Sequence, residues 1–341
     1  MTALQLAIVN TGLVSSVGLS APAACAAIRA GLTNPTETRF VDSEGQWIMA
    51  HAVPMESAWD GRAKLLRMAT RAIEECLGDI PREDWTGIPL ILCVAERSRP
   101  GRTPGLDDEL FAEIQQQLQV EFAPASLIVP QGRVGIGSAL LRAREFIART
   151  PGSRVVIAAA DSLLTWPTLR ALLSEERLLT PGNSNGFMPG EGAGAVLVRA
   201  AEPHDQLLCL GIGQAMEPAH ITSGEPLRGD GLAHAIKAAL GEAELQMHEI
   251  DFRITDISGE QYYFKEAALA LSRVLRVRKT GLDIWHPAEC VGEGGAFAGV
   301  AMLAVANASL RKNYARGPTV LLHAANDAGE RTAMILEFRR H

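Results

Sequence analysis

The sequence predicts an α/β protein built from two similar sets of strands and helices. Short apolar runs typical of buried parallel strands alternate with longer segments whose apolar residues recur at helical spacing. A polar and charged break at residues 200–205 divides the strands into two sets. Each set begins with a strand, passes through helices and ends on paired apolar strands, so we expect a duplicated α/β architecture.

Each expected element rests on one of these two periodicities. Short runs rich in Val, Ile, Leu and Ala predict strands that are buried on both faces. In chain order these strands are expected at 4–9, 89–94, 154–159, 194–198, 207–211, 252–257, 319–323 and 333–337. Apolar residues spaced three and four apart predict helices that pack on the sheet. These helices are expected at 21–30, 61–77, 106–118, 134–148, 231–240, 263–275 and 294–310.

The composition bounds the class of protein and its partners. An apolar fraction of 47% over 341 residues is ample for a buried sheet. The net charge of −7 comes without a basic cluster that could follow a phosphate backbone, which argues against nucleic acid as a partner. The first residues do not resemble a signal peptide, and no apolar stretch has membrane length. We therefore expect a cytoplasmic protein that binds neither nucleic acid nor membrane.

The cysteines and histidines do not predict a metal site. The five cysteines are scattered, without the paired spacing of a zinc site or of a disulfide framework. The eight histidines are equally dispersed, with no pair at ligand spacing. We expect buried, reduced thiols, no bound metal and no cofactor.

The most distinctive segment of the chain is a run of glycines at residues 186–194. A nucleotide-binding loop would need a helix after the glycines, whereas here they are followed by a strand-like run at 195–198. Closely spaced glycines allow tight turns and close backbone approach. The residues that define this segment are Gly186, Phe187, Gly190, Glu191, Gly192 and Gly194.

This segment resembles a family motif. Its letters N-G-F-M-P-G-E-G-A-G-A-V-L-V are similar to R-D-G-F-V-x-G-E-G-A-G-x-L-V-L of the β-ketoacyl synthases, the condensing enzymes of the thiolase-like superfamily. Residues 8–18 are similar to the family's opening I-T-G-x-G-x-V-S-x-x-G. The resemblance implies a five-layered α/β/α/β/α fold of two similar halves, at 1–202 and 203–341. It also implies a homodimer formed through the amino-terminal half.

The family's nucleophilic cysteine lies in C-A-T-G-x-H-x-I-G-x-A, between a strand and a long helix. Residues 129–139 match this motif at its glycines, Ile136 and Ala139, which places Val129 at the cysteine. Valine has no nucleophilic atom. A slip of two would place Gln131 there, as in glutamine-bearing partners of polyketide synthases, and no nearby shift supplies a cysteine.

The two family histidines are also replaced in this resemblance. Ser258 stands at the first and Glu293 at the second. Serine is not an acid or base near neutral pH, and a carboxylate would repel a developing enolate. Asn326 lies in a segment that matches the family's oxyanion-hole loop weakly, and Cys290 lies near Glu293 beside His286. A buried structural thiol is favoured over a relocated Cys290–His286 dyad.

We therefore expect no intact catalytic set. The residues expected to line the cleft are Gln131, Ser258, Cys290, Glu293 and Asn326. The leading interpretation is a catalytically impaired β-ketoacyl synthase-like protein that acts as a binding, adaptor or chaperone protein, with a role accessory to a bacterial secretion-system effector as one candidate context. The alternative is a 3-oxoacyl-ACP synthase-type acyltransferase, or a partner subunit that shapes the pocket of an active synthase. Under either interpretation, the expected protein partner is an acyl carrier protein, an active synthase or an effector protein.

Overall fold

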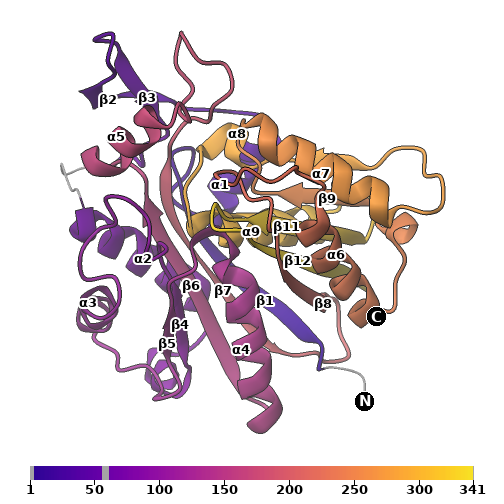
Figure 1. Ribbon diagram of the computed structural model, residues 1–341. Helices are drawn as coiled ribbons and strands as arrows, with labels where there is room; N and C mark the ends of the chain where they lie inside the picture. Colours follow the sequence, from indigo (N-terminus) through magenta and orange to yellow (C-terminus); the bar gives the residue numbers. More distant parts are fainter. Residues whose placement is uncertain (1–3, 56–60, 341) are drawn as a thin grey trace.

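A computed structural model describes residues 4–55 and 61–340, and it confirms the α/β fold class (Figure 1). The strands are β1 (Leu6–Val14), β2 (Thr36–Val41), β3 (Trp47–Ala50), β4 (Leu90–Cys93), β5 (Leu127–Val129), β6 (Arg154–Ser162), β7 (Glu191–Ala200), β8 (Gln206–Met216), β9 (Phe252–Thr255), β10 (Asp283–Trp285), β11 (Thr319–Ala325) and β12 (Glu330–Arg339). The helices are α1 (Ala21–Arg29), α2 (Gly61–Leu77), α3 (Glu109–Leu118), α4 (Gly135–Arg149), α5 (Trp166–Ser174), α6 (Asp230–Ala243), α7 (Gln261–Val274), α8 (Ala288–Val291) and α9 (Phe297–Arg311).

The main sheet contains the same strand arrangement twice. Its order among the described residues is β10-β9-β11-β12-β8-β1-β7-β6-β4-β5. Read outward from β1, the order β1-β7-β6-β4-β5 has two antiparallel and then two parallel pairings, and β8-β12-β11-β9-β10 repeats these directions. The two runs meet where Leu6–Ile8 pairs with Leu207–Cys209. A division of the chain at 202/203, in the loop between β7 and β8, stays a prediction.

Helices cover both faces of each run of strands and fill the space between the runs. Helices α4 and α9 pack against strands of both runs in one apolar core. Helices α2 and α3 cover the outer face of the first run, and α6 and α7 cover the outer face of the second. Helix α9 is buried on nearly all sides, as expected of a central layer. This is the five-layered α/β/α/β/α arrangement.

The structure differs from the expected elements in short segments and in the glycine run. Strands β5 and β10 and helix α5 are not among the expected elements. The two strands have three residues each, too few for a periodic pattern, and the helix buries only Thr168 and Leu169. Strand β7 begins at Glu191, three residues before the expected strand at 194–198, so Gly192 lies inside it together with Gly194. They lie there because α9 crosses that strand closely: a Cβ on Gly192 would come within 2.8 Å of the Phe297 ring.

Among the described residues, no helix is long and apolar enough to cross a bilayer.

Candidate functional site

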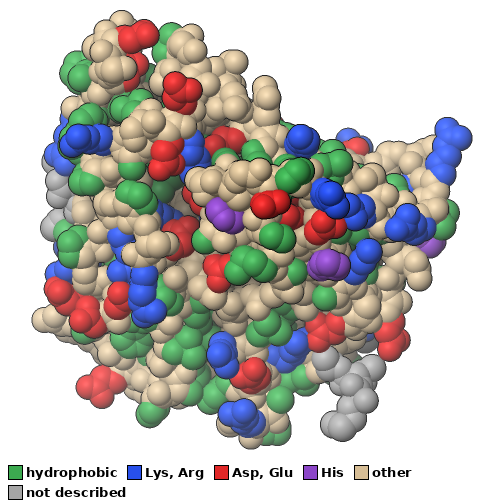
Figure 2. Space-filling view, viewed as in Figure 1, with side chains coloured by type: hydrophobic (Ala, Val, Ile, Leu, Met, Phe, Trp, Pro, Cys, Tyr) green, Lys and Arg blue, Asp and Glu red, His purple; other side chains and the backbone are tan. Residues whose placement is uncertain are grey.

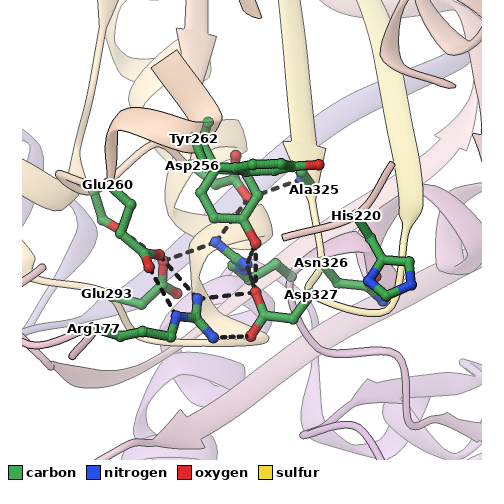
Figure 3. Close-up of polar contacts among 12 residues, drawn as sticks. Arg177, His220, Asp256, Glu260, Tyr262, Glu293, Ala325, Asn326 and Asp327 are labelled. Carbon is green, nitrogen blue, oxygen red and sulfur yellow. Dashed lines mark hydrogen bonds and ion pairs between the residues drawn. The ribbon is translucent and has the colours of Figure 1, made fainter. Parts of the chain in front are cut away.

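Charged residues gather where the parallel strands of both runs end. Arg133 follows β5, Asp161 lies near the end of β6, Asp256 follows β9, and Asp327 follows β11. The carboxyl ends of strands are where α/β folds place binding and reacting groups, because loops there are free to carry polar side chains. In Figure 3, Arg177, Glu260, Glu293 and Asp327 point toward one another from different elements of the chain.

Arg133 lies at the centre of this cluster. It is 6% exposed and follows Gly132, whose φ of +53° and hydrogen bond to the carbonyl of Val94 turn the chain inward. Its Nη1 donates to Glu293 Oε2 at 3.2 Å. Its Nη2 donates to the Tyr263 hydroxyl oxygen at 2.8 Å and to Asp327 Oδ1 at 2.7 Å.

Arg177 holds the opposite side of the cluster. Its Nε and Nη2 donate to the two oxygens of Glu260 at 2.8 and 2.9 Å, and its Nη1 donates to Asp327 Oδ2 at 2.7 Å. Burial alone would raise the pKa of Asp327, but Arg133 and Arg177 outweigh it and hold that pKa well below its usual range. Asp327 therefore stays ionised between two guanidinium groups.

The carboxyl groups of Asp256 and Glu293 are in the opposite situation. Burial raises the pKa of Asp256 to about 7, against the influence of Arg133, 3.8 Å away. Burial also raises the pKa of Glu293, although Ser258 Oγ donates to its Oε2 at 3.1 Å. The carboxyl group of Asp256 therefore changes its protonation state near neutral pH.

A cavity of about 170 Å³ adjoins the cluster. Arg133, Arg177, Glu293 and Asp327 of the cluster line it. Arg99 lines it as well, and its Nη1 lies 2.8 Å from both carboxylate oxygens of Asp161. None of the described residues that line this cavity is a cysteine or a histidine. The available groups can bind polar atoms, but they include no thiolate or imidazole.

No known family model matches the sequence, and no curated protein matches it significantly. Solved structures match over nearly the whole chain. A chain of the AntDE:AntF complex, described as a type II polyketide synthase acyl-carrier protein with its ketosynthase bound to the hexaketide, has a TM-score of 0.80 and 14% identity. The match covers 98% of this chain and 99% of that one.

Two further structures agree with this match. The ishigamide ketosynthase/chain length factor has a TM-score of 0.77 and 18% identity, with 99% of this chain and 100% of that chain covered. A β-ketoacyl synthase from Burkholderia phymatum has a TM-score of 0.74 and 16% identity, again with 99% and 100% covered. The chain has the ketosynthase fold.

Within this ketosynthase fold, the expected site residues lie in three places. Ser258 and Glu293 meet in the charged cluster. Val129 and Gln131 line a separate groove beside β5. Cys290 borders a third cavity between α1 and β10.

Asn326 is buried beside the cluster and does not join it. Its Nδ2 donates to Glu330 Oε2 at 2.5 Å, its Oδ1 accepts from the Glu330 backbone N–H at 2.9 Å, and its carbonyl accepts from Arg331. The next residue, Asp327, is the one that joins the cluster.

The glycine run at residues 186–194 lies directly against the site. The Gly190 N–H donates to the Glu293 carbonyl at 2.7 Å, and the Glu293 N–H donates to the Met188 carbonyl at 2.9 Å. A Cβ on Gly190 would lie 2.4 Å from the carbonyl oxygen of Val291, so only glycine fits this approach. Phe187 packs its ring under the Arg177 guanidinium, 5.7 Å from the ring centre.

Several site residues could not be chosen from the sequence. Arg133 and Asp256 lie inside the segments aligned with the family motifs, but at positions to which the motifs assign no role. Asp327 follows Asn326 directly. Arg177 lies just after α5, far in sequence from its partner Glu260, and no local pattern marks either residue.

Proposed function

We propose that this chain is a ketosynthase-fold protein that acts by binding a protein partner and does not form an acyl-enzyme. One observation carries the proposal: the side chains at the strand ends are arginines, carboxyls and a tyrosine that hydrogen bond to one another. Acyl transfer in the resembling family starts from a cysteine thiolate. The motif resemblance puts Val129 at that cysteine, in the groove beside β5, and no described residue that lines the cavity at the charged cluster is a cysteine either.

The cysteines do not supply a substitute nucleophile. Cys93 comes nearest to the expected position, since it pairs with Val129 between β4 and β5. It is 1% exposed, and burial raises the pKa of its thiol to about 12. The other four cysteines are buried too, and burial likewise raises the pKa of each thiol. A protonated, enclosed thiol is a poor nucleophile.

We propose an active ketosynthase as the partner, with this chain as its non-catalytic subunit. Two similar structures support this assembly: one is described as a ketosynthase/chain length factor, and another as a ketosynthase in complex with its chain length factor from Xenorhabdus doucetiae. The latter has 13% identity and a TM-score of 0.77, with 98% of each chain covered.

The edge strand β5 offers a surface for this partner. Among the described strands it pairs only with β4, so its outer edge keeps unpaired backbone groups that can bind another strand. A groove of about 800 Å³ runs beside it, bordered by Leu127, Ile128, Leu141 and Phe146. In Figure 2, hydrophobic side chains show at the surface over the lower part of the face, where Figure 1 places α4.

Two measurements test the proposal. Intact mass spectrometry after incubation with acyl-carrier thioesters should show no acyl adduct, and a stable adduct on any cysteine would refute it. Co-expression with ketosynthases of the same host should give a mixed dimer in size-exclusion chromatography with light scattering. Leu141→Asp should abolish that dimer, whereas Val277→Asp, in an exposed loop far along the chain, should not. A homodimer that excludes every ketosynthase would overturn the assignment of the partner.

A further inference from the structure

A second polar cavity, of about 490 Å³, lies at the other end of the first run of strands. Arg154, the first residue of β6, and Arg199, near the end of β7, both line it. Asp161, in the charged cluster, lies seven positions further along β6. At ~3.3 Å per residue the two ends are about 23 Å apart, so this cavity is separate from the candidate site.

Two arginines of this cavity lie side by side on adjacent strands of the sheet. Arg154 and Arg199 are direct partners in the antiparallel pairing of β6 and β7, so both side chains leave the same face. Like charges in this position repel. Arg154 forms no ion pair with any described residue, while Arg199 pairs with Glu202 at the exposed rim. Burial and Arg154 together lower the pKa of Arg199.

A third arginine approaches from the central helical layer. Arg311 of α9 donates from Nε to Asn307 Oδ1 at 2.8 Å and from Nη2 to the Val9 carbonyl at 3.2 Å. That carbonyl lies at an irregularity of β1, where the pairing register shifts between Ile8 and Asn10. Among the described residues that line the cavity, Asp79 is the one carboxylate. Three guanidinium groups therefore share a cavity with one lining carboxylate.

We propose that this cavity, here called the arginine pocket (Arg154, Arg199 and Arg311), binds a small molecule through a diphosphate group. A guanidinium group recognises phosphate oxygens with two parallel hydrogen bonds, and a cavity whose lining has more positive than negative groups attracts anions. A bound dianion would also neutralise the like-charge pair across β6 and β7. The volume suits a ligand of small-molecule size.

Isothermal titration calorimetry with pyrophosphate tests this assignment. The wild-type protein should show saturable binding, and Arg154→Gln should weaken it at least tenfold. Arg142→Gln removes an exposed arginine of α4 outside the pocket and should leave the affinity unchanged. A parallel titration with ADP distinguishes a nucleotide from other diphosphates. If ADP binds more tightly than pyrophosphate, the ligand is a nucleotide; if the two bind equally, the protein recognises the diphosphate group alone.

Thermal denaturation separates a binding role from a structural one. Without ligand, Arg154→Gln should melt no lower than the wild type, because it relieves the repulsion of Arg199. With pyrophosphate, only the wild type and Arg142→Gln should gain stability. The assignment is overturned if the wild type binds no pyrophosphate at millimolar concentration, or if Arg142→Gln loses as much affinity as Arg154→Gln.

Discussion

Replacing Asp256 by asparagine should remove a pH-dependent loss of stability. Asp256 is 3% exposed, accepts from the Ala325 N–H at 3.0 Å and faces Arg133 and Glu293. Burial raises the pKa of Asp256 from 3.8 to about 7. The folded protein therefore keeps this proton between about pH 4 and 7 while the unfolded chain loses it, so the unfolding free energy falls as the pH rises. A difference of about 3 units corresponds to ~4 kcal/mol across that range.

Urea denaturation of both proteins from pH 4 to pH 8 measures this term. The asparagine keeps the shape of the side chain and its acceptor for Ala325, but it cannot ionise. The unfolding free energy of the wild type, minus that of Asp256→Asn, should fall by several kcal/mol as the pH rises. Glu121→Gln, at an exposed position, controls for the general loss of a carboxyl group. A difference that stays constant within about 1 kcal/mol would refute the buried, raised-pKa description of this carboxyl group.

Further predictions concern the arginine at the centre, the glycine run and the thiols. Arg133→Met should lower the unfolding free energy by about 3–5 kcal/mol, because it leaves buried carboxyls without their partner, whereas exposed Arg142→Met should change it by less than about 0.5 kcal/mol. Denaturant melts measure both. Gly190→Ala should destabilise by about 1–3 kcal/mol through its clash with the Val291 carbonyl, and Gly241→Ala, in open space within α6, should stabilise by up to about 1 kcal/mol. Equal melting temperatures for these two glycine variants would contradict the close approach at Gly190. Iodoacetamide should modify the five buried thiols only after denaturation; rapid labelling of the native protein would show an accessible thiolate.

The sequence predicts the fold well because burial imposes regular patterns. Long strands such as β7 and β8 are buried along most of their length, and α9 is apolar on nearly all sides. Such segments leave a clear record in hydrophobic periodicity. The three-residue edge strands β5 and β10 leave none, because their pairing depends on neighbours that are distant in sequence.

For the candidate site, the sequence places Ser258 and Glu293 in one expected cleft, and the structure shows that their side chains hydrogen bond. A binding role for these two residues stays a prediction. Arg177, Glu260 and Asp327 could not be found in the same way, because each comes from a different loop and becomes a partner only when the chain folds. A single sequence carries no local signal for such a contact.

The close packing at Gly190 bears on how genes of this kind are recognised in genomes. Gly190 is required there by the nearby Val291 carbonyl and Gly192 by the Phe297 ring, and neither requirement involves a reacting group. A gene copy can therefore lose its nucleophile under relaxed selection and still retain this signature, because any chain that folds must keep it. Genome searches that use the signature therefore find chains that share the architecture, whatever residue stands at position 129.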